Sequence, residues 1–230
     1  MTVLQATFIG VGSMVGAGIF ALLGAAGAVA GSAVWLSFLL AGAIAGLQGY
    51  SFAKLGARYP TGGGLLTYLS RGFGEGHIAG IGAWLFFTAG SIVVAMIASS
   101  FGGYASSVVA GGDPFWEKVL GVLLILVMTG LNAIGSTAVA RVQSILVTIV
   151  LAILIMFAAV TIVNLDPTLL APSGYPGLRE IIASVALTFF ALLGFGVITF
   201  TAKDLPNPAR QLPRAIYFAL AIATTVYVAV

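Results

Sequence analysis

The chain has 230 residues, of which 60% are hydrophobic and only 7% are charged, whereas a soluble domain carries about 25% charged residues. This composition predicts an integral membrane protein. The sequence has no cysteine and a single histidine, His77, which excludes disulfides, thiolate metal sites and histidine clusters. We therefore expect no metal and no cofactor, and the small formal charge of +3 does not indicate a nucleic-acid partner.

Apolar runs long enough to cross a bilayer follow one another along the whole chain. One helical crossing needs about 20 residues, and the runs are separated by short segments rich in glycine and proline. The predicted spans are 4–28, 33–54, 77–108, 117–134, 142–164, 180–202 and 213–230. Because no soluble domain fits between them, we expect residues 1–230 to form a single transmembrane domain.

The first predicted span contains a cluster of glycines at positions 10, 12, 16 and 18. Each glycine costs roughly 1 kcal/mol relative to alanine inside a helix. One interpretation is that the helix opens here and presents bare backbone, which a membrane protein tolerates only where protein or a cavity covers it. The alternative is that Gly12 and Gly16 form a face of small residues for close helix packing.

The distribution of basic residues predicts the orientation of the chain. Cytoplasmic loops carry an excess of lysine and arginine. With the N-terminus in the cytoplasm, seven of these residues lie at the inner side and two at the outer side. The inner residues are Lys54, Arg58, Arg71, Arg141, Lys203, Arg210 and Arg214, and the outer residues are Lys118 and Arg179. We also expect residues 64–71 to form a short amphipathic helix on the inner surface.

A second interruption lies near the middle of the sixth predicted span, where Gly194 and Gly196 stand among bulky residues. Five spans separate the start of the first span from the start of the sixth, so the two cross the bilayer in opposite directions, as in an inverted repeat. The ends of two broken helices would then face each other, with N–H groups for a carboxylate and carbonyls for an ammonium. We expect non-helical backbone at residues 12–18 and 193–196.

Four segments, taken in order, resemble the APC superfamily of amino acid, polyamine and organocation transporters. They are Ile9-Gly10 through Gly16-Ala17-Gly18-Ile19-Phe20; residues 51–60 with Gly62-Gly63; Ala140-Arg141-Val142-Gln143; and Phe189-Phe190-Ala191 with Gly194-Phe195, Asp204-Leu205-Pro206-Asn207-Pro208 and Pro213-Arg214-Ala215-Ile216. The resemblance covers essentially the whole chain. It implies an all-α polytopic protein with the leucine-transporter-type fold of two inverted five-helix repeats and discontinuous helices one and six. The chain would hold the first repeat, the sixth helix and part of the seventh, as a fragment of a longer permease.

The same resemblance implies a substrate site formed mainly by backbone at the two breaks. The substrate carboxylate should meet the N–H groups of Gly16, Ala17 and Gly18. The substrate ammonium should meet carbonyl groups near Met14 and Leu193. Side chains would matter little at these five positions.

Four side chains complete the implied pocket. Phe190 corresponds to the aromatic residue that closes over the substrate. Phe87, Ser91 and Val94, at helical spacing on the third span, should line the pocket. Helix packing alone is the alternative for Phe87 and Val94, whereas the hydroxyl of Ser91 needs a partner in mid-membrane.

Three positions depart from the pattern of the superfamily. Gly196 stands where many relatives have glutamate after the Gly-Phe pair, which removes a titratable group from the gate. Lys54 stands where relatives often have glutamate. Val150 stands where some proton-coupled members have a lysine, which excludes proton coupling through that lysine and leaves the coupling ion, H⁺ or Na⁺, open.

The leading hypothesis is a secondary transporter of neutral amino acids in the cell membrane, working by alternating access, with the amino acid and the lipid bilayer as partners. A membrane enzyme would need paired carboxylates or a nucleophile with its base at one depth, and the six acidic residues lie in loops or at span ends. A channel would show a polar stripe along a pore, and none is visible. A non-transporting helical bundle is the other alternative.

Overall fold

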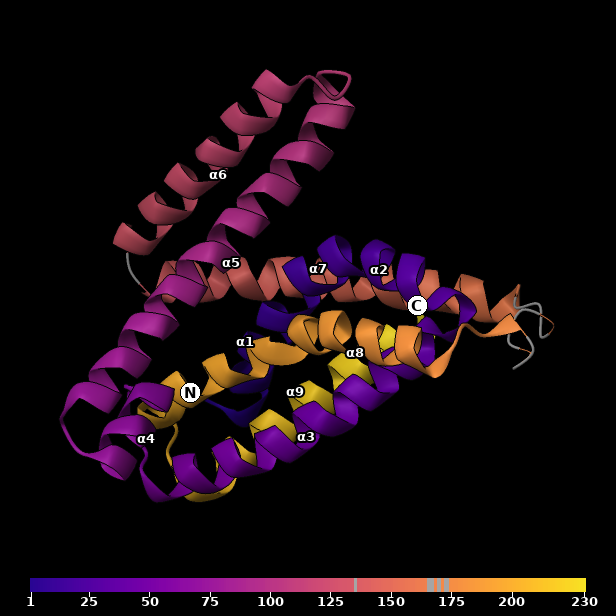
Figure 1. Cartoon of the computed structure of the whole chain (residues 1–230). Coiled ribbons are helices and arrows are strands. Elements are labelled where there is room, and N and C mark those ends of the chain that lie inside the picture. Colours follow the sequence, from indigo (N-terminus) through magenta and orange to yellow (C-terminus); the bar gives the residue numbers. More distant parts are fainter. Residues whose placement is uncertain (135, 165–167, 169–170, 172–173) are drawn as a thin grey trace. The chain divides into compact units, whose positions relative to one another are not determined.

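The computed structural model describes residues 1–134, 136–164, 168, 171 and 174–230, without the side chains of residues 17 and 136–141. Its regular elements are all helices (Figure 1). They are α1 (Val3–Val15), α2 (Ala17–Ala30), the 3₁₀ helix η1 (Gly31–Ala33), α3 (Val34–Arg58), α4 (Gly64–Phe73), α5 (His77–Val109), α6 (Pro114–Ile134), α7 (Ser136–Val163), α8 (Leu178–Leu192), the 3₁₀ helix η4 (Leu193–Asp204) and α9 (Pro208–Ala229). The predicted helix at 64–71 is present as α4.

Six helical stretches in the described chain are long and apolar enough to cross a membrane. They are Gly18–Arg58, His77–Val109, Pro114–Ile134, Val142–Val163, Leu178–Asp204 and Pro208–Ala229. Together with the all-helical structure they confirm a polytopic membrane protein of the all-α class. The predicted first span, 4–28, is divided between α1 and α2, which have 13 and 14 residues.

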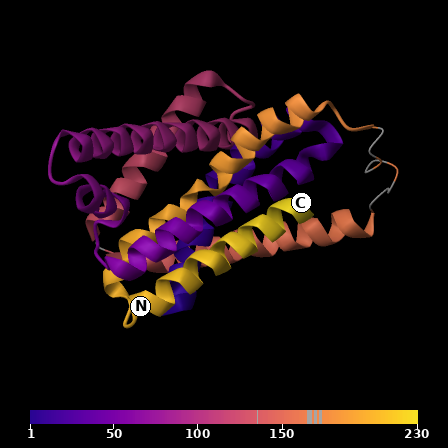
Figure 2. The same cartoon turned by 60° about the horizontal axis from the view of Figure 1, so that its bottom comes forward.

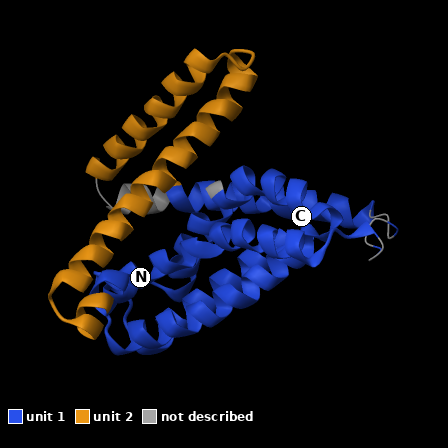
Figure 3. Cartoon of the chain, in the orientation of Figure 1, with its two compact units in different colours: residues 1–68, 143–230 blue, residues 69–142 orange. Residues whose placement is uncertain are grey.

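The chain folds as two compact units, coloured separately in Figure 3. Unit 1 consists of residues 1–68 and 143–230, and unit 2 consists of residues 69–142. This division concerns packing within the chain, and the single transmembrane domain over residues 1–230 stays a prediction.

Unit 1 is a bundle in which helices from both ends of the chain interleave. The helix α3 lies beside α9 over much of its length (Figures 1 and 2) and also contacts α8. In turn, α1 packs against α9 and η4, and α2 packs against α8. The chain therefore brings residues 1–58 against residues 178–230, and the two predicted interruptions lie in helices that touch.

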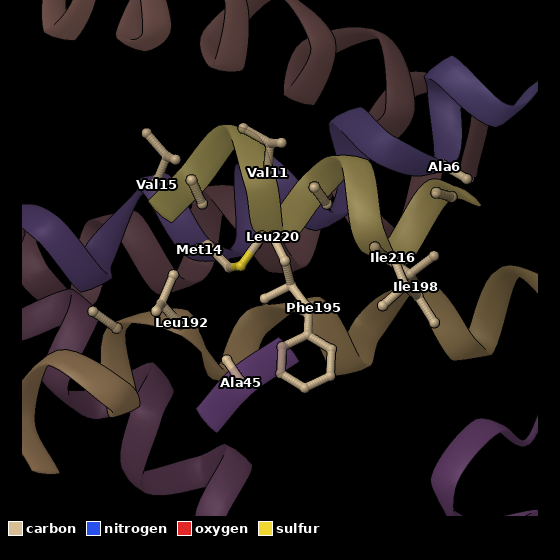
Figure 4. Packing of buried hydrophobic residues seen from close by; sticks show 14 of the residues in the cluster. Ala6, Val11, Met14, Val15, Ala45, Leu192, Phe195, Ile198, Ile216 and Leu220 are labelled. Carbon is tan, nitrogen blue, oxygen red and sulfur yellow. The ribbon is translucent and has the colours of Figure 1, made fainter. Parts of the chain in front are cut away.

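The core of unit 1 contains buried side chains from α1, α3, α8, η4 and α9 (Figure 4). Met14, Leu192, Phe195 and Ile198 are fully buried there. Lipid tails are as apolar as these side chains, so burial gives little hydrophobic gain in a bilayer, and close packing must hold the helices together. Small residues such as Ala45 on α3, which is also fully buried, permit that close approach.

Unit 2 is a hairpin of α5 and α6 joined by a tight turn. Gly111 and Gly112 have φ values of +63° and +84°, which glycine adopts without steric cost. The hydroxyl of Ser106 donates to the carbonyl of Asp113 at 2.9 Å, and the Asp113 carboxylate accepts from the N–H of Phe115 at 2.7 Å at the start of α6. These contacts close the turn and set the register of the two helices.

Candidate functional site

The first helix break lies at a single residue, Gly16. The helix α1 ends at Val15, α2 begins at Ala17, and Gly16 between them has φ −73° and ψ −102°, outside the helical region. The discontinuity predicted for residues 12–18 is therefore present but narrower, because Gly12 and its neighbours keep helical geometry. A short break exposes fewer backbone groups, which favours it in a medium without water.

The packing of the glycines distinguishes the two interpretations of their cluster. A Cβ atom at Gly12 would collide with the side chain of Val147 on α7, so Gly12 permits close helix packing. At Gly16 the nearest described atom is the carbonyl oxygen of Gly12 in α1, at 3.3 Å from the added Cβ. One glycine thus serves packing and the other serves the break.

The second interruption is a change of helix type. The α-helical hydrogen bonding of α8 ends at Leu192, and residues 193–204 continue as η4. The non-helical backbone predicted at 193–196 is thus a 3₁₀ helix instead, because such a helix still satisfies its backbone groups inside a membrane. A 3₁₀ run of 12 residues is unusual, since runs longer than 3–4 residues are uncommon.

The two interruptions are in direct backbone contact. The hydroxyl of Ser13 donates to the carbonyl of Gly194 at 2.8 Å, its shortest contact, and also lies 3.0 Å from the carbonyls of Ile9 and Gly10 in its own helix. A Cβ atom at Gly194 would lie 2.5 Å from the carbonyl carbon and oxygen of Ser13, and one at Gly18 would lie 2.7 Å from the carbonyl oxygen of Ala191. Only glycine permits both approaches, so the ends of α1, α2, α8 and η4 meet at one place.

Five of the predicted site residues, all in unit 1, lie at this place. Gly16 forms the break and Gly18 is buried in the first turn of α2, where backbone N–H groups lack a partner within the helix. Phe190 and Leu193 are 38% and 39% exposed at the junction of α8 and η4, and the side chain of Met14 is fully buried. The sixth, residue 17, starts α2, and its side chain lies outside the described part of the chain.

Tyr227 is a residue of this site that the sequence did not identify. Its hydroxyl donates to the carbonyl of Met14 at 2.6 Å, in a buried position. The ring is 1% exposed and packs on Phe38 with centroids 5.2 Å apart. A carbonyl oxygen has two lone pairs, so one acceptor site on Met14 is already used. A tyrosine in an apolar helix gives no sequence signal for a partner more than 200 residues away.

Replacing Tyr227 by phenylalanine should leave one acceptor site of the buried Met14 carbonyl without its donor, at a cost of about 1–3 kcal/mol. For a protein of this size we expect the midpoint of thermal unfolding in detergent to fall by at least about 2–4 °C. Tyr217→Phe is the matched control, because Tyr217 lies on the same helix and is 41% exposed. Equal shifts for the two variants would contradict a role for the Tyr227 hydrogen bond.

The remaining predicted residues, Phe87 and Ser91, belong to α5 in unit 2. Phe87 is 64% exposed and stacks on Trp84, with ring centroids 5.7 Å apart and an interplanar angle of 17°. The hydroxyl of Ser91 donates to the carbonyl of Phe87 at 3.0 Å. Its partner in mid-membrane is thus its own helix, which removes the argument that the hydroxyl needs a ligand. Their place in a pocket, with that of Val94, stays a prediction.

Comparison with known proteins decides the family. Residues 1–230 match the family described as amino acid permease. The chain belongs to the amino acid permease family. This membership confirms the resemblance to the APC superfamily drawn from the sequence motifs.

Within the described residues, no group of three or more His, Cys, Asp or Glu side chains could hold a metal ion.

Individual relatives support the same family. The permease chain is 34% identical to the inner membrane transport protein YbaT of Escherichia coli, over 96% of its own length. It is 28% identical to the methylthioribose transporter and 27% identical to the branched-chain amino acid permease BcaP of Bacillus subtilis, in each case over 97% of its length. The chain spans about half of these curated relatives, 52% of each.

Proposed function

We propose that this chain forms part of a secondary transporter that carries neutral amino acids across the membrane by alternating access. The observation that carries the proposal is the backbone contact between the break at Gly16 and the junction of α8 with η4, held by the Ser13–Gly194 hydrogen bond. Two interrupted helices that meet in a membrane place unpaired backbone groups where a small zwitterion can bind.

The backbone at the breaks suits both ends of an amino acid. The first N–H groups of α2, at residues 16–18, lie at the positive end of a helix dipole and suit a carboxylate. The carbonyl of Leu193, with the second lone pair of the Met14 carbonyl, suits an ammonium. Phe190, which is partly exposed beside Leu193, is positioned to cover a bound substrate.

The side chain of the substrate should be neutral. A charged group in mid-membrane costs at least roughly 2.5–3.5 kcal/mol without a counter-charge. The described side chains around the breaks are uncharged, and the nearest charged residues along η4 are Lys203 and Asp204 at its end. The relative BcaP is named for branched-chain amino acids, whose side chains are uncharged.

Two further elements of the proposal concern orientation and coupling. The excess of lysine and arginine on one side supports an N-terminus in the cytoplasm of a cell-membrane protein. The identity of a coupling ion, H⁺ or Na⁺, stays open. Val150 packs against the core of unit 1 and offers no titratable group, so proton coupling would have to use another residue.

Competition for uptake tests the substrate class. With the natural protein in proteoliposomes, alanine, serine and the branched-chain amino acids should inhibit uptake of labelled alanine at concentrations at least about tenfold lower than arginine, glutamate or putrescine. Tenfold corresponds to about 1.4 kcal/mol, which is less than the cost of one uncompensated charge. Stronger competition by a charged compound would contradict the neutral substrate class, and no uptake of any of these compounds would contradict the amino acid itself.

A further inference from the structure

The loop that joins α3 to α4 is docked on η4 through glycines. A Cβ atom at Gly62 would lie 2.8 Å from the Lys203 side chain, and one at Gly64 would lie 2.7 Å from the hydroxyl oxygen of Thr199. Gly64 also has φ +48°, a conformation that glycine adopts most readily. The short distance to Thr199 and the positive φ both require glycine at position 64, and glycine there allows the loop to pack against η4.

Tyr68 fills the space behind this contact, one turn into α4. It is only 6% exposed, and its hydroxyl oxygen would lie 2.8 Å from a Cβ atom at Gly56 on α3. Burial raises the pKa of Tyr68 above its ordinary value, and the neighbouring Thr199 hydroxyl opposes part of that rise. The proton of Thr199, however, goes to the carbonyl of Gly196 at 2.6 Å. Among the described residues, none makes a hydrogen bond of normal geometry with the Tyr68 hydroxyl.

A buried hydroxyl without a partner destabilises the conformation that buries it. The penalty disappears when the hydroxyl reaches water or when the hydroxyl is removed. The element beneath it, η4, is a long 3₁₀ helix, and a 3₁₀ stretch within a spanning helix often marks a hinge. A weakened contact and a hinge therefore coincide at the same end of η4.

We propose that residues 61–68 form a latch on residues 199–203 of η4, and that Tyr68 positions this latch while its unpaired hydroxyl favours the open form. This inference rests on the proposed function, because only a protein that works by alternating access would open and close such a latch during transport. With the latch closed, Gly62 and Gly64 contact Lys203 and Thr199 of η4; with the latch open, the Tyr68 hydroxyl is hydrated. The tyrosine thus sets the ratio of closed to open forms.

Thiol cross-linking measures that ratio without requiring transport. The chain has no cysteine, and a Cβ atom at Gly62 would lie 2.8 Å from Cδ of Lys203, so a short bifunctional thiol reagent can join the pair Gly62→Cys and Lys203→Cys when the latch is closed. In a natural protein with these two thiols only, a brief pulse of this reagent reports the ratio of cross-linked to uncross-linked molecules. We expect Tyr68→Phe to raise this ratio about 5- to 30-fold. Tyr59→Phe, in the same loop, should change the ratio less than about twofold.

An unchanged or lower ratio of cross-linked to uncross-linked molecules for Tyr68→Phe would overturn the proposal. If the Tyr68 hydroxyl stabilised the closed form instead, its removal would lower this ratio. Gly64→Ala provides a second test if Tyr68→Phe does not fold. Its added Cβ would lie 2.7 Å from the hydroxyl oxygen of Thr199 and should lower the ratio, and an equal or higher ratio would again overturn the proposal. Uptake of labelled alanine by the same protein tests the proposed function separately, so the two can fail independently.

Discussion

Gly194→Ala is expected to lower amino acid uptake by at least about tenfold and to destabilise the protein by roughly 3 kcal/mol. The added Cβ would lie 2.5 Å from the carbonyl carbon and oxygen of Ser13 and 2.8 Å from the N atom of Met14. All three atoms belong to the backbone, so no side-chain rotation can relieve the collision, and overpacking of this kind costs about 1–3 kcal/mol or more. The two interrupted helices must separate, which moves both halves of the proposed substrate site.

The measurements are uptake of labelled alanine by the natural protein in proteoliposomes and thermal unfolding in detergent. Gly196→Ala is the matched control, because Gly196 lies in the same 3₁₀ helix and its added Cβ meets first the ring of Phe52, at 3.3 Å. A side-chain ring can shift by the few tenths of an ångström required. Comparable losses for the two variants would show that helix conformation, rather than the contact with α1, controls the effect.

Gly102→Leu should separate the α5–α6 hairpin and lower the stability of the protein by about 3 kcal/mol or more. A Cβ atom at Gly102 would collide with the carbonyl oxygen of Glu117 and lie 3.3 Å from the N atom of Gly121. The reverse approach is also too close for a side chain, since a Cβ atom at Gly121 would lie 2.8 Å from the carbonyl oxygen of Ala98. Small residues at helix contacts are the means by which membrane helices approach closely.

The adjacent residue supplies the control for this prediction. No described atom lies within 4 Å of a Cβ atom at Gly103, so Gly103→Leu adds the same side chain without a collision. Both variants gain about 0.5–1 kcal/mol of helix propensity, and the difference between their unfolding midpoints isolates the cost of the clash. We expect Gly103→Leu to be neutral or stabilising. A fall in its midpoint as large as that of Gly102→Leu would contradict the packing argument.

The sequence determined the kind of protein and its helices. A composition of 60% hydrophobic and 7% charged residues indicates a membrane protein. The length of each apolar run predicts a helix, because the bilayer core has no water and backbone N–H and C=O groups must bond to each other within the segment. The glycine clusters also predicted where helices one and six are interrupted. These features are local, since each depends on residues that are neighbours along the chain.

The tertiary structure decided which residue of each cluster carries which role. By local propensity the glycines at 12, 16 and 18 are equivalent, and only contacts with α7 and α8 assign Gly12 and Gly18 to close packing and leave Gly16 as the break. The Tyr227 donor to Met14 and the Ser13 donor to Gly194 join residues 213 and 181 positions apart. Such partners depend on how distant helices pack, because a hydroxyl in an apolar helix has the same local sequence whether its acceptor lies in its own helix or in another.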